Sequence, residues 1–394
     1  MLRGAAAGLV LCDHLRSYTF INFRSLSNPG LLTKGFYAIT SFGPQAVIIF
    51  FALSGFLVGG KVLEDMLIGR WSWPGYFLRR LTRLWIVVIP ALVITLILDW
   101  INLYFTGGIG YDRSMRIYTS GPDVNTLLDH SLTTFLGNIA FLQTIYVPLF
   151  GTNGPMWSLA NEFWYYVIFP SAAGIFLVQY SLCRRLVAIG VLAFFISILP
   201  WWLLYGGAIW AAGAGAAWLA KLPIYASVAR HNGVRVLSVA LPMIALVFAK
   251  LFADESSDLM FGLLVALALP ALSAFPSFGK AYRFLARAAA EISYTLYLTH
   301  FPLLTVVVLV GFAPYRFSPG LAGLATYLGL LSIAVLWAVG CWWCFERNTD
   351  RVFRLLSRHI LINRSRATVA ARILTTPMPT LHETTDPHAK CYSA

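Results

Sequence analysis

The first twenty residues, MLRGAAAGLVLCDHLRSYTF, combine an apolar run with ionisable side chains whose spacing could support chemistry. Arg3 and His14 are 11 residues apart, which is three helical turns plus about 20°, so one helix face would carry both, roughly 16 Å apart. Asp13 would be turned about 100° away. A buried neutral histidine accepts a proton, so His14 is the candidate general base. The structural alternatives are interhelical hydrogen bonding for His14 and an ordinary helix-end charge for Arg3.

Two further segments place polar side chains along one helical face. In NGPMWSLANEFWYYVIFP, Ser158 and Glu162 are spaced i, i+4. In EISYTLYLTHFPLL, Ser293, Tyr297 and His300 are spaced i, i+4, i+7. Each stripe alone is equally consistent with polar packing between helices. Together with the first segment, they favour one internal site, because ionisable groups inside a membrane are costly and usually functional.

A third pattern lies in GRWSWPGYFLRRLTRLWIVVIP, which carries Arg79, Arg80 and Arg83 just before an apolar run. Arg80 and Arg83 would share a helix face. Arginine pairs bidentately with phosphate, so these residues could bind an anionic donor. Anchoring of the helix at the membrane interface, together with Trp71 and Trp73, would also explain them.

The composition indicates a polytopic membrane protein. Of 394 residues, 59% are hydrophobic and 11% charged, and the mean hydropathy is +0.73, whereas soluble domains are about one-quarter charged. The net charge of +13 does not indicate a nucleic-acid partner, because the basic residues fall between apolar runs. Cys341 and Cys344 have CxxC spacing without a second ligand pair nearby, so no metal is expected.

A membrane-spanning helix needs roughly 20 apolar residues. Candidate spans are 4–23, 44–61, 84–105, 157–178, 186–205, 206–220, 235–253, 258–275, 292–312 and 320–345, with a short re-entrant piece at 134–150. The predicted fold is therefore an all-α integral membrane protein, a bundle of about ten transmembrane helices within 1–346. Residues 347–394 are polar and basic, and we expect them to form a mostly disordered cytoplasmic tail.

The distribution of basic residues predicts the orientation. If the N-terminus is cytoplasmic, most of the 29 lysines and arginines lie on inner loops, inner helix ends and the tail, as the positive-inside rule requires. We therefore expect a multi-pass protein of the plasma (inner) membrane with both termini in the cytoplasm.

Six segments, in order, resemble the acyltransferase 3 family of integral membrane acyltransferases, which modify surface sugars and related acceptors. They are LRGAAAGLVLCDH, FFALSGFLVGGKVL, YFLRRLTRLW, GPMWSLANEFWYYVIFP, ISYTLYLTHFPLL and FERNTDRVFR. The resemblance implies a ten-helix bundle, an acyl-CoA donor that enters from the cytoplasm, and an acceptor handled toward the other face. The acyl-CoA would be a substrate, and no permanently bound cofactor is implied.

Matching these motifs residue by residue assigns roles. The resemblance implies that His14 is the catalytic histidine and Arg3 its partner, and that Arg80 and Arg83 are the cytoplasmic arginine pair, beside which Arg79 would also bind the donor. The tryptophan-serine-leucine-x-x-glutamate element falls on 157–162, so Glu162 is a further candidate catalytic residue that binds or orients the acceptor. The residues expected to bind the acceptor or to line its channel are Trp157, Ser158, Ser293, Tyr297 and His300.

The predicted reaction is O-acylation of a cell-surface or lipid-linked glycan or a related acceptor. His14 would deprotonate the acceptor hydroxyl as it attacks the thioester carbonyl, or would itself carry the acyl group transiently. Sequence leaves both routes open, and the expected acyl group is acetyl. The alternatives are a solute or proton-coupled transporter, in which these ionisable groups relay protons, and an assembly protein without chemistry.

Overall fold

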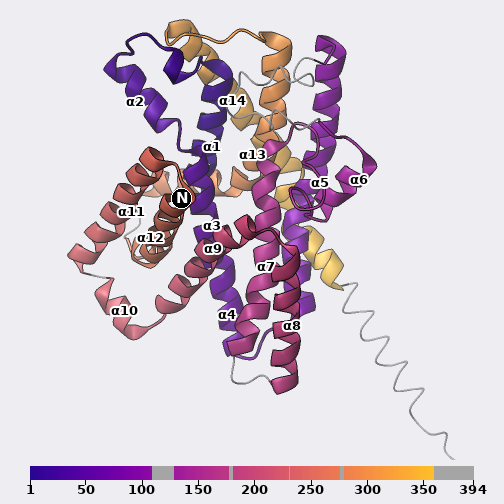
Figure 1. Ribbon diagram of the computed structural model, residues 1–394, viewed down its shortest axis with the longest axis vertical. Coiled ribbons are helices and arrows are strands. Elements are labelled where there is room, and N and C mark those ends of the chain that lie inside the picture. The colour runs from indigo at the N-terminus through magenta and orange to yellow at the C-terminus, as the bar shows by residue number, and fades with distance from the viewer. Residues whose placement is uncertain (109–127, 177–180, 230, 276–278, 359–394) are drawn as a thin grey trace, which may run out of the picture. The chain divides into compact units, whose positions relative to one another are not determined.

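The computed structural model describes residues 1–108, 128–176, 181–229, 231–275 and 279–358. The helices are α1 (Leu2–Thr19), α2 (Leu31–Ile39), α3 (Gly43–Ser54), α4 (Gly60–Leu67), α5 (Trp73–Thr106), α6 (Leu132–Ile139), α7 (Trp157–Phe176), α8 (Leu182–Ile198), α9 (Trp201–Leu219), α10 (Pro223–Val228), α11 (Asn232–Phe252), α12 (Glu255–Ser273), α13 (Lys280–Gly311) and α14 (Leu321–Cys344) (Figure 1). Within the described residues, β pairing is limited to isolated bridges. The predicted all-α class is confirmed.

A helix lies over each of the ten predicted spans. Among the described residues, six helical stretches are long and apolar enough to cross a membrane by length and composition: Leu31–Leu67, Trp73–Thr106, Asn232–Phe252, Glu255–Ser273, Lys280–Gly311 and Leu321–Arg358. The count of about ten spans therefore stays a prediction. The predicted boundary between the spans 186–205 and 206–220 is wrong. Helix α8 ends at Ile198, the backbone is extended at Leu199 and Pro200, and α9 begins at Trp201. Proline fixes φ and suits a helix start.

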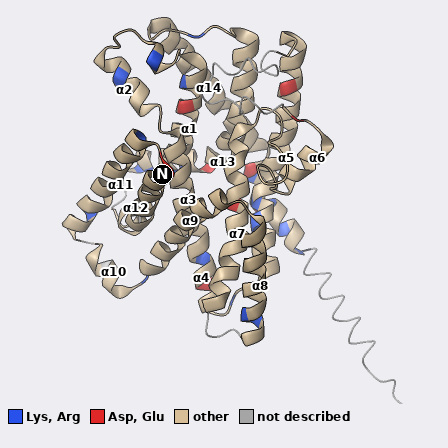
Figure 2. Ribbon diagram, in the orientation of Figure 1, with Lys and Arg blue, Asp and Glu red and all other residues tan. Residues whose placement is uncertain are grey.

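Burial separates central helices from peripheral ones. Of the most apolar window of Lys280–Gly311, 83% is buried inside the protein, against 11% for Asn232–Phe252. Helix α8 has no buried residue at all. Charged residues occupy little of the ribbon (Figure 2). Apolar side chains on the outer helices therefore face outward, as expected where lipid is the solvent.

Helix α1 packs against α13, α3 and α14, so the first predicted stripe lies beside the central helix. The stretch Gly43–Leu67 contains a π-helical turn at Gly55–Gly59 between α3 and α4, and it packs against α9. Two glycines make this approach possible. A Cβ on Gly213 would lie 2.2 Å from the Ala52 carbonyl oxygen, and one on Gly55 would lie 1.8 Å from the Trp210 carbonyl oxygen. Close backbone contact through small residues is a common means of helix association in membranes.

The chain divides into two compact units, Met1–Asn348 and Thr349–Ala394. In the second unit, residues 349–358 are helical. The predicted disordered tail falls mostly on 359–394, which lies outside the described residues.

The glycine contact gives a stability prediction. Gly213→Ala should destabilise the folded protein by about 1–3 kcal/mol, because the added methyl group would have to push two backbones apart. The measurement is the midpoint of thermal unfolding in detergent, followed by loss of the monodisperse size-exclusion peak. The matched control is Gly190→Ala on α8, where a Cβ would meet nothing within 4 Å. Equal midpoints for the two variants would contradict the proposed close packing.

Candidate active site

Two histidines from distant parts of the sequence meet in the helix bundle. His14 Nδ1 on α1 lies 3.0 Å from His300 Nε2 on α13. The rings stack with centroids 5.2 Å apart and planes 21° apart. His300 is 1% exposed, and His14 is partly exposed. The edge of Phe301 packs against the His14 ring, so an apolar wall borders this pair.

The hydrogen bonds around this pair set the positions of its protons. His300 Nδ1 lies 2.7 Å from the backbone carbonyl of Leu296, which only accepts, so Nδ1 must carry the proton. A neutral His300 then presents a lone pair at Nε2. His14 must donate to it from Nδ1, which leaves the His14 Nε2 lone pair unprotonated. The neutral pair therefore offers one defined proton acceptor, His14 Nε2.

A proline frees a backbone carbonyl near this site. Pro302 cannot donate to the carbonyl of Leu298, four residues earlier, and the Asn153 side-chain amide donates to that oxygen at 3.0 Å. Asn153 also donates to the Thr95 hydroxyl at 3.1 Å. It is fully buried, and its own Oδ1 has no hydrogen-bond partner in the part of the chain that the structure describes. Asn153 thereby joins the loop before α7 to α5 and to α13 beside His300.

The predicted acceptor residues only partly converge. Ser158 and Tyr297 are joined by a 2.7 Å hydrogen bond, and the Tyr297 and His300 ring centroids are 6.4 Å apart. Ser293 is buried and donates to the Ala290 carbonyl of its own helix. Trp157 is 38% exposed and packs against Phe51 rather than the histidines. The structure therefore brings together Ser158, Tyr297 and His300, and leaves Trp157 and Ser293 apart from them.

Helix α13 also carries the contacts of Arg3. The Arg3 guanidinium lies over the Tyr294 ring, 6.0 Å from its centroid. The Tyr294 hydroxyl donates to the Leu84 carbonyl on α5. Arg83, also on α5, has a guanidinium nitrogen 4.0 Å from a carboxylate oxygen of Glu346. Arg3 and Arg83 are thus linked through Tyr294, which contacts Arg3 and bonds to Leu84, the residue after Arg83. Tyr294 lies six residues before His300 on α13.

Arg80 has a different environment from its neighbours. Its guanidinium lies over the rings of Tyr76 and Tyr166, 5.8 Å from each centroid. Its Nε is buried without a hydrogen-bond partner, and within the described residues Arg80 forms no ion pair. Arg79 is exposed on the other side of the helix turn. Arg80 is therefore the arginine of this group best placed to receive an external anion.

Glu162 lies on the arginine side of this arrangement. Its Oε1 accepts a hydrogen bond from Ser54 at 2.6 Å and another from the Tyr166 hydroxyl. The Tyr166 ring is one of the two that face Arg80. The described hydrogen bonds do not join Glu162 to either histidine. Its contacts fit a residue that positions Tyr166 and hence Arg80.

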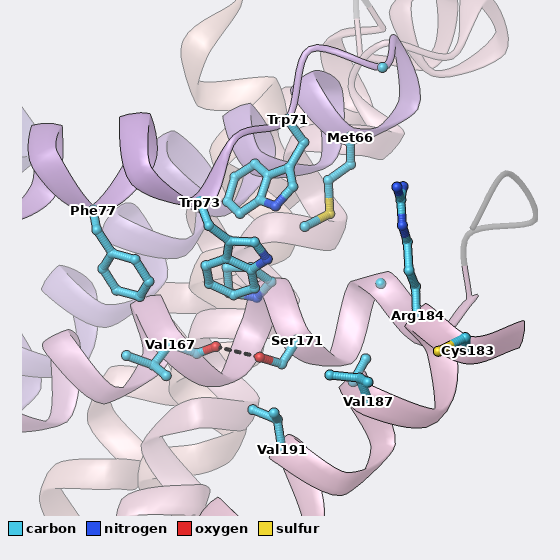
Figure 3. Close-up of a pocket in the computed structure, with 14 residues that line it drawn as sticks. Met66, Trp71, Trp73, Phe77, Val167, Ser171, Cys183, Arg184, Val187 and Val191 are labelled. Atoms are coloured by element: carbon cyan, nitrogen blue, oxygen red, sulfur yellow. Dashed lines mark hydrogen bonds between the residues drawn. The ribbon is translucent and has the colours of Figure 1, made fainter. Parts of the chain in front are cut away.

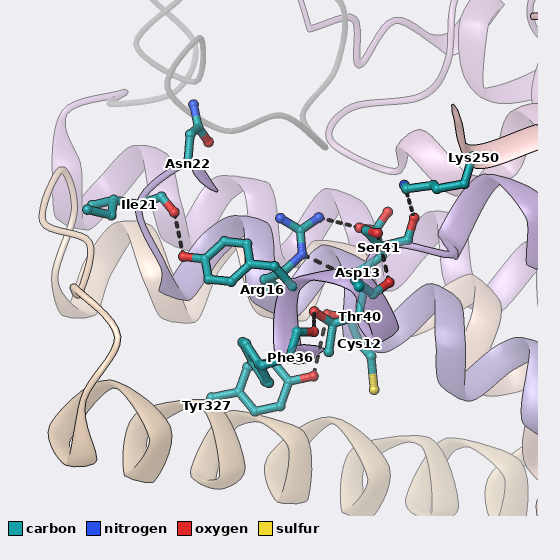
Figure 4. A network of polar contacts seen from close by, with 12 residues as sticks. Cys12, Asp13, Arg16, Ile21, Asn22, Phe36, Thr40, Ser41, Lys250 and Tyr327 are labelled. Carbon is teal, nitrogen blue, oxygen red and sulfur yellow. Dashed lines mark hydrogen bonds and ion pairs between the residues drawn. The ribbon is translucent and has the colours of Figure 1, made fainter. Parts of the chain in front are cut away.

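Asp13 is held away from the histidine pair. It forms a 2.5 Å ion pair with Arg16, and Arg16 Nε donates to the Thr40 carbonyl. Lys250 donates to the neighbouring Ser41 carbonyl (Figure 4). This network lies on a different side of α1 from His14, as the helical rotation predicts.

A second buried cluster involves Asp99, which no motif had singled out. Asp99 is 2% exposed and accepts hydrogen bonds from the Thr152 backbone and hydroxyl, 2.9 and 2.5 Å away. His130 Nε2 lies 2.8 Å from the same carboxylate. Gly151 has φ +53°, and a Cβ there would lie 2.1 Å from Asp99 Oδ2. This cluster fixes the loop that carries Asn153. The sequence signal for it was an acidic residue inside the predicted span 84–105, because ionisable groups in a membrane are costly and usually functional.

A second carboxylate, Asp129, lies just before α6, at the start of the segment that leads to Asn153. Hydrogen bonds from the Thr134 hydroxyl and from the Ser131 backbone lower the pKa of Asp129. Ser131 caps α6 by accepting from the Thr134 N–H. The predicted re-entrant piece at 134–150 thus contains one short helix followed by turns, and its re-entry into the membrane stays a prediction.

Comparison with known proteins gives one match. The family model described as an acyltransferase domain matches residues 1–344. The match covers α1 to α14 and so includes both histidines and the arginines. No curated protein and no solved structure matches the chain.

The histidine geometry predicts different kinetic effects for substitutions of His14 and of His300. His14→Ala should lower the rate of acyl transfer by about 100- to 10,000-fold, because it removes the proton acceptor. His300→Leu should lower kcat with little change in KM, since it removes only the group that orients His14. His300→Gln should recover part of that loss, because its amide oxygen can still accept from His14 Nδ1. The measurement is kcat and KM across a pH series.

The control is Cys12→Ala, two residues before His14 on the same helix. Cys12 contacts the Tyr327 hydroxyl through its side chain and its backbone carbonyl, and the described contacts do not join it to either histidine. It should retain wild-type turnover. If His300→Gln and His300→Leu have the same kcat and the same pH profile, then His300 does not act by accepting a hydrogen bond from His14.

Proposed function

The chain belongs to the acyltransferase 3 family, whose domain model matches residues 1–344, and we propose that it transfers an acyl group from cytoplasmic acyl-CoA to a hydroxyl of a cell-surface or lipid-linked glycan. It is a membrane acyltransferase with several apolar helices. The observation that supports the proposal is the His14–His300 pair, whose hydrogen bonds leave His14 Nε2 unprotonated and which has Tyr297 beside His300.

The proposed reaction balances its protons through that nitrogen. His14 Nε2 accepts the hydroxyl proton as the acceptor oxygen bonds to the thioester carbonyl carbon. When the carbon–sulfur bond breaks, the leaving CoA thiolate takes the proton back from Nε2. His300 Nε2 accepts from His14 Nδ1 throughout and stabilises the transient positive charge. A route in which Nε2 itself attacks the thioester and passes the acyl group on is equally consistent with this geometry.

The donor side of the proposal rests on Arg80. Nucleotide phosphates are anionic, and arginine offers several N–H donors in a fixed fork. Arg80 forms no ion pair in the described part of the chain, whereas Arg83 already faces the buried Glu346. Arg3, next to Tyr294, would contact the donor between the phosphates and the histidines. The donor would therefore extend along α13 from the arginines toward His300.

The glycan acceptor would approach from the opposite end. Ser158 and Tyr297 present hydroxyl groups beside His300, and hydroxyls of this kind bind sugar hydroxyls. With the positive-inside orientation, both termini and the donor entrance lie in the cytoplasm of a plasma (inner) membrane protein. The expected acyl group is acetyl.

Donor binding provides the first test of this function. Purified protein should bind acetyl-CoA, and Arg80→Ala should weaken that binding by about ten-fold or more, the usual effect of losing a charged hydrogen bond. The deficit should shrink at high salt, because salt screens charge pairing. Isothermal titration at two salt concentrations measures both effects. A proton-coupled transporter, the alternative function, has no reason to bind acetyl-CoA.

The control is Arg70→Ala, which removes an exposed charge from the loop before α5. It should bind acetyl-CoA as the wild type does. Unchanged affinity in Arg80→Ala would show that Arg80 only anchors the helix.

The acceptor is tested in cells. Deletion of the gene should remove an acyl modification from surface or lipid-linked glycans, measured as a mass difference of one acyl group per modified sugar. Complementation with wild type should restore it, and complementation with His14→Ala should not. An unchanged glycan profile in the deletion strain would exclude glycans as the acceptor class.

A further inference from the structure

A pocket of about 860 Å³ lies away from the histidines, between the α4–α5 connection, α7 and the first turns of α8 (Figure 3). Ligand pockets typically have volumes of about 300–1,000 Å³. The proposed acyl-transfer chemistry uses none of its lining residues. The pocket is therefore a candidate site for a different ligand.

The shape of this pocket follows from the spacing of its lining residues. Helix α8 contributes Cys183, Val187 and Val191, one residue per turn along a single face, which spans about 12 Å of helix. Helix α7 contributes Val167 and Ser171 in the same way. The pocket is thus an elongated groove parallel to two helices. Its wall is apolar, because the Ser171 hydroxyl donates to the Val167 carbonyl within its own helix.

Polar groups lie at one end of the groove. Arg184, in the first turn of α8, is the single charged residue among the fourteen that line it. Figure 3 shows its guanidinium reaching toward the connection that carries Trp71. The indole Nε1 of Trp71 is buried and has no hydrogen-bond partner among the described residues. One cation and one N–H donor therefore stand at the end of a long apolar wall.

We propose that this groove binds an anionic glycerophospholipid of the cytoplasmic leaflet. Its phosphate would pair with Arg184, an ester carbonyl would accept from the Trp71 N–H, and one acyl chain would lie along α7 and α8. Cys183 and Val187 line the groove and are exposed, so a lipid chain can reach the groove from outside the protein. Arginine near an anionic leaflet is favourable, and tryptophan prefers the level of the headgroups.

The same lipid would support the donor-binding helix. Trp73 and Phe77 line the groove from α5 and stack on each other with planes 19° apart. Arg80 follows Phe77 by three residues on that helix. An acyl chain in the groove would fill the space between the start of α5 and α7, which carries Tyr166.

The test uses the full-length protein in nanodiscs with equal amounts of phosphatidylcholine and phosphatidylglycerol. A photoreactive phosphatidylglycerol, with a diazirine in its acyl chain, should label peptides that contain Phe77, Val187 or Val191. Arg184→Ala should lower this labelling about five-fold, the effect expected for one arginine beside an anionic headgroup. Val187→Phe, which fills the groove, should lower it without removing charge.

The charge control is Lys280→Ala, an exposed cation at the start of α13 that does not line the groove. It should label as the wild type does. Equal labelling by the matching phosphatidylcholine probe, or an equal loss in Lys280→Ala, would overturn the proposal. Displacement of the probe by acetyl-CoA or by a polyprenyl phosphate, but not by added phosphatidylglycerol, would assign the groove to donor or acceptor and overturn it as well.

Discussion

The cost of leaving a polar group without a partner inside a membrane governs how this bundle is organised. Pro170 frees the Tyr166 carbonyl and Pro302 frees the Leu298 carbonyl, because proline has no N–H to donate. Tyr76 satisfies the first carbonyl from α5, and Asn153 satisfies the second from the loop before α7. One of these contacts fixes an aromatic ring beside Arg80, and the other fixes a loop beside His300. The donor end and the histidine end of the site thus each depend on a helix that contains a proline, α7 and α13.

Helix α13 joins those ends. His300 and Tyr294 are six residues apart on it, which is about 9 Å along the axis. Tyr294 contacts Arg3 and bonds the carbonyl next to Arg83, while His300 holds His14. Helix α1 also carries one residue of each end, Arg3 and His14, about 16 Å apart along its axis. Because two adjacent helices each carry a residue of both ends, a small shift between them would change the donor contacts and the histidine pair together.

Sequence periodicity predicted those parts of the site that lie on one helix. The rotation of α1 separates Asp13 from His14, and the i, i+3 spacing in α13 places Tyr297 beside His300, as the structure has them. Periodicity could not predict which helices touch, so the contact of His14 with His300 across the bundle was not foreseen. Nor did it predict that Ser54, on the neighbouring α3, donates a hydrogen bond to Glu162. Such contacts depend on packing angles that hydropathy does not encode.

Asp99 shows a further limit of reading charge from sequence. Its sequence neighbours on α5 are mostly apolar. Its hydrogen-bond partners, Thr152 and His130, come from the chain beyond the end of that helix. Its burial is possible because three donors reach it at once. Only a folded loop with glycine at 151 brings them there.

The separation of Asp13 from His14 also bears on the chemistry. A carboxylate facing the imidazole would favour its charged form and so remove the lone pair that a general base needs. Asp13 is instead paired with Arg16 at 2.5 Å. It sits against Gly43, where a Cβ would lie 2.5 Å from Asp13 Oδ2, so the absence of a side chain there lets the carboxylate turn away. His14 is left with a neutral partner, His300, whose own proton is held by the Leu296 carbonyl. The neighbouring charges are therefore arranged so that His14 Nε2 stays available to accept a proton.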